Sequence, residues 1–342
     1  MTTAPQLIVE FPGVEVSDPE AARTVLSAAR DAAAVTAARS VPLLLPETVD
    51  GGGPGLDPSI LAGILTADLR GPHIAGTVAR PADARPWLIA TASTSRNAPF
   101  NLARRIQSLN RITGGQVGLF LRADGLDPVT SGASAGLAAA VGDRSRLLKE
   151  YVAVLRRLWV SFPEEALIGD REAGRFADPR SLVPASFAGE FYSVAGALNV
   201  PLPSAHRTLL LADAVTAALG GPVDGIIGPD STTPDSGAVP VYRTVTWIPA
   251  ASRSQALDAL ERQHGSLPRS VINGGVPAAT GESGVVVAGT ADDAAQVLRD
   301  GLPAHSFLRV RTGAVHFTAL LDALLDELPE LHESRDQQAH AR

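Results

Sequence analysis

Short apolar runs alternate with stretches of helical periodicity along most of the chain. Nine runs are rich in large aliphatic and β-branched residues: Leu7 to Phe11, Val41 to Pro46, Trp87 to Ser93, Gln116 to Ala123, Thr208 to Asp213, Val223 to Gly228, Tyr242 to Pro249, Gly284 to Gly289 and Phe307 to Thr312. Strands that are apolar on both faces and separated by helices indicate a parallel sheet covered on both sides. About eight such units favour a TIM (β/α)8 barrel over an open doubly wound sheet, although the count alone leaves both open.

Two amphipathic helices have clear signals. The first is predicted from Phe100 to Ile112, where an apolar residue recurs at every third or fourth position. Asn97 is its expected N-cap, and Pro99 falls in the first turn. The second is predicted from Arg144 to Phe162, and Pro163 should end it.

The chain is predicted to form a single domain over residues 1–332, followed by a flexible polar tail over 333–342. A segment from about 164 to 205 is rich in Pro and Gly and has little periodicity. We interpret it as an insertion after the fourth βα unit that could cover the barrel mouth. A complete βα unit is expected near the C-terminus, with Thr290 as N-cap and Gly301 as the stop.

Composition excludes several classes of function. The net charge of -7 and the lack of a basic run argue against nucleic-acid binding. No stretch approaches the roughly 20 apolar residues of a membrane span, so a soluble cytoplasmic protein is expected. The absence of cysteine removes disulfides, thiolate metal sites and cysteine nucleophiles. None of the 7 histidines has metal-ligand spacing, and no Gly-x-Ser-x-Gly elbow accompanies a triad, so neither a metal site nor a hydrolase is predicted.

The stretch TASTSRNAPFNLARRIQSLNRITGG, Thr91 to Gly115, combines a strand end, a hydroxyl-rich turn and a helix. By itself, this turn would be interpreted as a helix-capping device. The stretch resembles the luciferase-like flavin monooxygenases, in the branch that contains the nitrilotriacetate and dibenzothiophene-sulfone monooxygenases. In that branch, a TAST-type strand end precedes Asn-x-Pro-[Tyr/Phe]-x-Leu-Ala-Arg. The segments Glu150 to Pro179 and Phe187 to Pro203 continue the resemblance.

The resemblance implies a TIM barrel that uses reduced FMN and dioxygen on a small organic substrate. It also implies a separate flavin reductase as partner and leaves a homo- or hetero-oligomer open. Carried over to this sequence, the family's flavin contacts fall on an acid, three turn hydroxyls and an arginine that replaces a small hydroxyl residue: Asp50, Thr91, Ser93, Thr94 and Arg122. No catalytic acid or base is identified.

Other family contacts are changed in this chain. The family's His-x-x-x-Tyr pair falls on Val141 and Ser145, and Thr216 stands near the position of a family serine. These changes favour an alternative hypothesis, a non-catalytic relative that kept the barrel but lost flavin affinity and serves as a partner subunit or binds another ligand.

Overall fold

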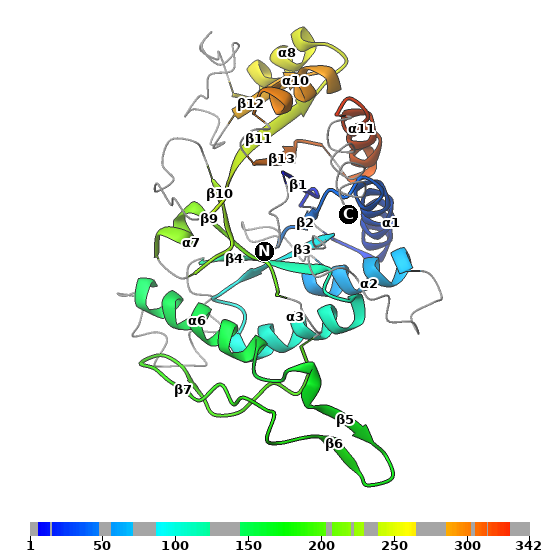
Figure 1. Ribbon diagram of the computed structural model, residues 1–342. Helices are drawn as coiled ribbons and strands as arrows, with labels where there is room; N and C mark the ends of the chain where they lie inside the picture. The colour runs from blue at the N-terminus through cyan, green and yellow to red at the C-terminus, as the bar shows by residue number, and fades with distance from the viewer. Residues whose placement is uncertain are drawn as a thin grey trace, which may run out of the picture. The chain divides into compact units, whose positions relative to one another are not determined.

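The computed structural model describes residues 6–13, 16–47, 56–70, 87–123, 144–202, 207–219, 222–228, 239–264, 285–301, 305–312 and 314–328. The chain divides into two compact units. The first unit comprises Met1–Thr2 and Arg70–Asp224, and the second comprises Thr3–Leu69 and Gly225–Arg342. Each unit is described separately below (Figure 1).

In its described residues, the first unit has three parallel strands, their helices and two small hairpins. Its elements are β3 (Leu88–Ser93), α3 (Pro99–Thr113), β4 (Val117–Arg122), α6 (Arg144–Trp159), the 3-10 turn η2 (Glu164–Ala166), β5 (Leu167–Asp170), β6 (Arg175–Ala177), β7 (Phe187–Ala188), β8 (Ser193–Val194), β9 (Leu210–Asp213) and α7 (Ala214–Leu219). β4 pairs in parallel with both β3 and β9.

The second unit carries the remaining parallel strands. Its elements are β1 (Leu7–Glu10), α1 (Pro19–Ala38), β2 (Leu43–Leu45), α2 (Pro58–Arg70), β10 (Gly225–Gly228), β11 (Val241–Pro249), α8 (Arg253–His264), β12 (Val285–Gly289), α10 (Ala291–Gly301), β13 (Ser306–Val310) and α11 (Ala314–Asp326). β13 pairs in parallel with β1 and β11, and β11 also pairs with β10 and β12.

The large sheet is a closed barrel. Its strand order in the described residues is β10-β9-β4-β3-β2-β1-β13-β11-β12, and an additional pairing joins β10 to β11. That pairing closes the sheet, with β12 attached beside β11. The predicted TIM barrel is therefore confirmed, and each of the nine apolar runs overlaps one of these strands.

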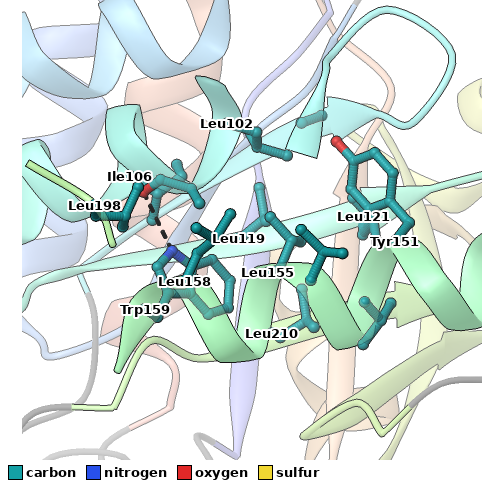
Figure 2. Close-up of a cluster of buried hydrophobic side chains, with 14 of the residues drawn as sticks. Leu102, Ile106, Leu119, Leu121, Tyr151, Leu155, Leu158, Trp159, Leu198 and Leu210 are labelled. Atoms are coloured by element: carbon teal, nitrogen blue, oxygen red, sulfur yellow. Dashed lines mark hydrogen bonds between the residues drawn. The ribbon is translucent and has the colours of Figure 1, made fainter. Parts of the chain in front are cut away.

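The core of the first unit lies between its sheet and the helices α3 and α6. Leu119, Leu121 and Leu210 from the strands pack with Leu102 and Ile106 of α3 and with an apolar stripe of α6. Figure 2 shows this cluster and the Trp159 indole Nε1, which donates to the carbonyl of Ala103 at 3.2 Å. The apolar periodicity of both helices is explained by this shared layer.

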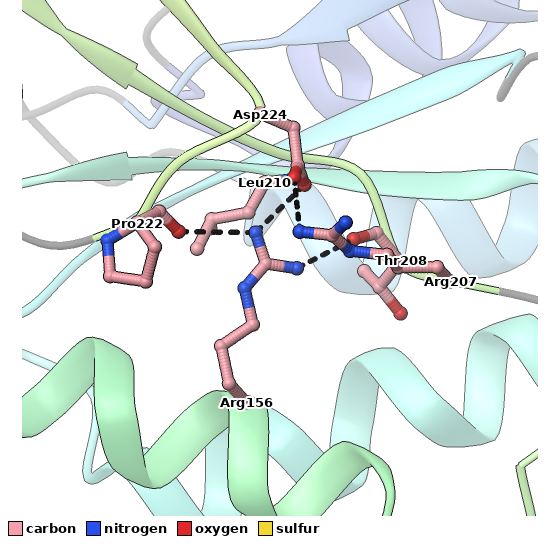
Figure 3. Close-up of polar contacts among 6 residues, drawn as sticks. All are labelled: Arg156, Arg207, Thr208, Leu210, Pro222 and Asp224. Atoms are coloured by element: carbon pink, nitrogen blue, oxygen red, sulfur yellow. Dashed lines mark hydrogen bonds and ion pairs between the residues drawn. The ribbon is translucent and has the colours of Figure 1, made fainter. Parts of the chain in front are cut away.

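An ion-pair network holds the start of β9 to α6. The Asp224 carboxylate accepts from the Leu210 backbone N–H at 2.8 Å, from Arg156 at 2.8 Å and from Arg207 at 2.6 Å (Figure 3). Arg156 also reaches the carbonyls of Thr208 and Pro222. Because the Arg156 and Asp224 side chains are mostly buried, the network fixes the position of β9 against α6.

The insertion forms the antiparallel hairpins β5–β6 and β7–β8. Figure 1 shows β5–β6 projecting beyond α3 and α6. The Glu150 carboxylate of α6 accepts hydrogen bonds from three consecutive backbone amides of the insertion, at Glu190, Phe191 and Tyr192. Three apolar side chains of the insertion, Phe187, Tyr192 and Leu198, pack on the α3–α6 core. Because these contacts are with the helix layer, a role in covering the barrel mouth stays a prediction.

The predicted end signals are partly confirmed. Thr290 caps α10 reciprocally with Asp293: the Thr290 N–H donates to the Asp293 carboxylate at 2.8 Å, and the Asp293 N–H donates back to Thr290 Oγ1 at 3.3 Å. The N-cap prediction for α3 is wrong. Ala98 occupies that position without a side-chain hydrogen bond, because Asn97 is used in the preceding turn. The predicted tail over 333–342 lies outside the described residues.

Candidate functional site

A polar row lies at the carboxyl ends of β3 and β4, on the face that points away from the helices. The alternate residues Ala90, Ala92, Leu119 and Leu121 belong to the core packed on α3 and α6. Since successive side chains of a strand point to opposite faces, Thr91, Ser93 and Arg122 face the inside of the barrel. Catalytic and binding residues of TIM barrels lie at this end of the strands.

The turn after β3 is held by hydrogen bonds on both sides. The Thr94 backbone N–H donates to the Arg122 carbonyl at 2.9 Å, and the hydroxyls of Ser93 and Ser95 lie 2.7 Å apart. Asn97 Nδ2 donates to the Ser93 carbonyl at 2.9 Å. The Tyr151 hydroxyl of α6 donates to the Asn97 carbonyl at 2.6 Å, so the turn is fixed to the helix layer. Such a turn presents its hydroxyl groups in a defined geometry.

Thr91 is the unusual member of the row. Its side chain is 4% exposed, and its hydroxyl Oγ1 has no hydrogen-bond partner among the residues that the structure describes. Buried polar groups in native proteins are nearly always satisfied, so each exception calls for an explanation. A ligand that supplies the missing partner is one such explanation.

Arg122 brings a positive charge to the same edge. Its guanidinium Nε lies 3.8 Å from the carboxylate of Asp213 at the end of β9, and the two side chains are about one third exposed, 35% and 31%. At this distance and exposure the ion pair adds little stability. Asp213 is also engaged by the Thr216 backbone N–H at 2.6 Å, which orients the carboxylate. The pair therefore leaves a positioned cation beside the hydroxyl groups of β3.

Comparison with known proteins places this geometry in context. No family model matches the chain. The chain is 32% identical over 113 residues to N-acetyl-S-(2-succino)cysteine monooxygenase of Bacillus subtilis (strain 168), which covers 33% of this chain and 26% of that protein. It is 34% identical over 126 residues to nitrilotriacetate monooxygenase component A of Aminobacter aminovorans, covering 34% of this chain and 26% of the relative. The matches thus span about a quarter of the length of these curated relatives.

The solved structure of a long-chain alkane monooxygenase superposes with a TM-score of 0.62 at 17% identity, covering 98% of this chain and 92% of that one. The whole fold is therefore shared, while the sequence match is confined to part of the chain. The chain is therefore similar in sequence to curated monooxygenases over about a third of its length, and it shares the fold of the solved long-chain alkane monooxygenase.

The luciferase-like resemblance predicted five flavin contacts for this chain. Thr91, Ser93, Thr94 and Arg122 lie together at the ends of β3 and β4 in the structure, whereas Asp50 lies outside the described residues. Their role toward a flavin stays a prediction, as does the choice of cofactor.

Two positions that differ from the luciferase-like pattern have structural partners here. The Ser145 hydroxyl donates to the carbonyl of Leu219. The Thr216 hydroxyl, which is buried, accepts from the Ala123 backbone N–H at 2.8 Å. Ser145 therefore ties α6 to the end of α7, and Thr216 ties α7 to the residue that follows β4. Val141 lies outside the described residues.

Sequence reasoning missed two polar residues beside the row at the ends of β3 and β4, Asp213 and Ser95. Asp213 closes the apolar run TLLLAD, and the carboxyl ends of neighbouring parallel strands meet at one edge. That rule could have paired it with Arg122.

Among the described residues, no group of three or more His, Asp or Glu side chains could hold a metal ion. The described helices include none that is both long and apolar enough to cross a membrane.

Proposed function

We propose that the chain is a monooxygenase that binds reduced FMN against the β3–β4 wall and uses dioxygen to oxidise a small organic substrate. A separate reductase would supply the reduced flavin. The observation that carries the proposal is the buried Thr91 hydroxyl without a partner, in a wall built from the residues that the luciferase-like resemblance selects. Relatives that share part of the sequence are monooxygenases by name.

The side chains on this wall fit a reduced flavin. An isoalloxazine ring offers nitrogen and carbonyl groups at its polar edge, and the hydroxyls of Thr91 and Ser93 can both donate and accept. Arg122 can stabilise the negative charge of a reduced ring or of a phosphate. When bound, reduced FMN supplies the electrons that activate dioxygen. The chain's contribution is to orient the flavin and to limit access of water to it.

The proposal is tested by titrating the purified protein with reduced FMN under anaerobic conditions. The variants Ser93→Ala and Asp50→Ala should each raise the dissociation constant about fivefold or more, the loss of about one hydrogen bond. Ser108→Ala is the matched control, because its hydroxyl bonds to the Arg104 carbonyl within α3. Unchanged affinity in Ser93→Ala and Asp50→Ala would show that the site is assigned wrongly.

A second function is favoured by the Ser145 hydrogen bond to Leu219, which commits that side chain to the protein itself. The chain would then be a non-catalytic paralogue with impaired flavin binding that serves as a partner subunit or binds another ligand. If the protein does not bind reduced FMN at high micromolar concentration, the monooxygenase hypothesis is rejected and this alternative is supported. Co-purification with a catalytic paralogue is its direct test.

A further inference from the structure

The inner face of β3, β4 and β9 carries two layers of side chains. Strand register places Thr91 beside Phe120, and Phe120 beside Leu211. Neither of these apolar side chains has a hydrogen-bonding group, so neither can serve the Thr91 hydroxyl, which has no partner among the described residues. Register also places Ser93 beside Arg122, in the next layer toward the carboxyl ends of the strands. The two layers therefore differ in chemistry, since the first is neutral and the second contains a cation.

Asp213 belongs to the charged layer. Register pairs Leu121 of β4 with Ala212 of β9, and Leu121 packs in the core on α3 and α6. Arg122 and Asp213 follow these two residues, so they share the opposite, inner face. Their ion pair, 3.8 Å from Arg122 Nε to the Asp213 carboxylate, agrees with this placement. The charged layer thus lies about 7 Å along the strands from the layer of Thr91.

The Asp213 carboxylate is held in a hydrogen-bonded frame. One of its oxygens accepts from the Thr216 backbone N–H at 2.6 Å. Thr216 is buried, and its hydroxyl accepts at 2.8 Å from the backbone N–H of Ala123, the residue after Arg122. The Arg122 carbonyl accepts from the Thr94 backbone N–H at 2.9 Å. The backbone of Arg122 and the carboxylate that faces its side chain are therefore fixed relative to each other.

The Arg122 guanidinium is the loosely held member of this frame. Its 3.8 Å contact with Asp213 is longer than a hydrogen bond, and the nitrogen that the carboxylate approaches is Nε, at the inner end of the group. The two terminal nitrogens carry four of the five N–H donors of a guanidinium. Among the described residues, no hydrogen bond engages them. These donors can therefore bind a ligand while Nε stays beside Asp213.

We propose that Asp213 is a positioning residue for Arg122, whose terminal nitrogens bind an oxyanion of the ligand, a phosphate or a carboxylate. The terminal N–H donors of a guanidinium match two oxygens of such a group. Attraction to a fixed carboxylate restricts a long side chain before the ligand arrives, so less conformational entropy is lost on binding. Because the oxyanion would belong to the flavin or to the organic substrate, the inference rests on the proposed function and adds Asp213 to that site.

Positioning and simple repulsion predict opposite effects of neutralising Asp213. The carboxylate attracts Arg122 over 3.8 Å, whereas it repels an anion beyond the guanidinium over a longer distance. Coulomb energy falls with distance, and water and salt screen the longer interaction more strongly. The attraction therefore dominates, and loss of the Asp213 charge should weaken anion binding. A carboxylate that only repelled the anion would give tighter binding once neutralised.

The test uses the full chain with sodium phosphate and sodium acetate as probes, titrated at constant ionic strength while the thermal unfolding midpoint is followed. At least one probe should raise the midpoint of the wild type. Arg122→Gln should weaken that binding about tenfold, and Asp213→Asn about threefold. Asp213→Glu, which keeps the charge, should recover part of the loss. In the Arg122→Gln background, Asp213→Asn should have no further effect, because Asp213 acts through Arg122.

Matched controls are available in the same unit. Asp170 accepts from the Ala173 backbone N–H at 2.9 Å, the same three-residue spacing as Asp213 and Thr216, but it lies on the hairpin β5–β6. Arg104 is an exposed arginine of α3. Asp170→Asn and Arg104→Gln should both bind the probe like the wild type.

Three results would overturn the proposal. The first is a wild type that responds to neither probe. The second is Asp213→Asn that binds the probe as tightly as the wild type or more tightly. The third is a loss in Asp213→Asn that persists unchanged in the Arg122→Gln background, because a merely structural role of Asp213 would give that result.

Anaerobic flavin titrations separate the two sources of the oxyanion. If Arg122→Gln loses affinity for reduced FMN but not for reduced riboflavin, Arg122 binds the flavin phosphate. If both reduced flavins bind Arg122→Gln like the wild type while acetate binding is lost, Arg122 binds a substrate carboxylate. A wild type that binds a probe through Arg122 and Asp213 but does not bind reduced FMN would keep this inference and reject the flavin function alone.

Discussion

Replacing Thr91 by valine should stabilise the protein against unfolding and weaken its binding of reduced FMN. Valine has nearly the shape of threonine, so the substitution leaves no cavity on β3. It removes a hydroxyl that is 4% exposed and has no partner. An unmade hydrogen bond of a buried polar group costs about 1 to 3 kcal/mol, so Thr91→Val should raise the free energy of unfolding by about 1 kcal/mol. The bond that a flavin would make is lost, so the dissociation constant should rise about fivefold.

The assay is urea unfolding of the unliganded protein, together with the anaerobic titration of reduced FMN. Thr113→Val is the matched control. Thr113 is also buried, but its hydroxyl accepts from the Gln116 backbone N–H at 3.0 Å. That variant leaves a buried donor unpaired and should lose about 1 to 3 kcal/mol without any change in flavin affinity. If Thr91→Val loses stability as Thr113→Val does, the Thr91 hydroxyl has a hydrogen-bond partner in the unliganded protein.

Other expectations follow from the insertion and the C-terminal βα unit. Glu150→Ala removes the acceptor of three backbone amides and should cost about 2 kcal/mol, with faster limited proteolysis of the insertion; unchanged proteolysis would contradict this. Burial and the nearby Glu150 carboxylate raise the pKa of Tyr192 to about 12, so its stabilising contribution is complete below about pH 10 and is lost as the pH rises through 12. An ultraviolet titration should show a transition near pH 12 that Tyr192→Phe removes, and its persistence in the variant would exclude Tyr192. Gly289 has a φ of +152° and a Cβ there would lie 2.2 Å from the Asp293 carboxylate, so Gly289→Ala should cost about 1 to 3 kcal/mol; Gly196→Ala, with nothing within 4 Å, should be neutral in the same urea assay.

The fold could be predicted because its strands are buried on both faces. Several apolar runs, such as LIVE in β1 and LLL in β2, are continuous rather than alternating, as expected for a parallel sheet covered on both faces. The N-cap of α3 was harder to predict from the sequence. Asn97 is a preferred N-cap residue, but its amide was equally able to bond the Ser93 carbonyl, and tertiary packing with Tyr151 favoured that alternative.

Residues of the candidate site could be predicted only where they lie close together in the sequence. Thr91, Ser93 and Thr94 fall within one motif, and resemblance selected them together. Pairs assembled by the barrel carry no such signal. Glu10 and Arg309 are 299 residues apart, and only strand register brings them into contact. That a hydroxyl such as Thr246 lacks a partner also depends on every surrounding atom, which periodicity does not report.

The central claim is that reduced FMN binds this chain against the wall formed by β3 and β4. A crystal structure of the protein with FMN bound tests it most directly. Thr91 Oγ1 is expected to lie within hydrogen-bond distance of the flavin, with Ser93 or Arg122 as a second contact. A flavin bound elsewhere, with Thr91 Oγ1 still unpartnered, would contradict the claim.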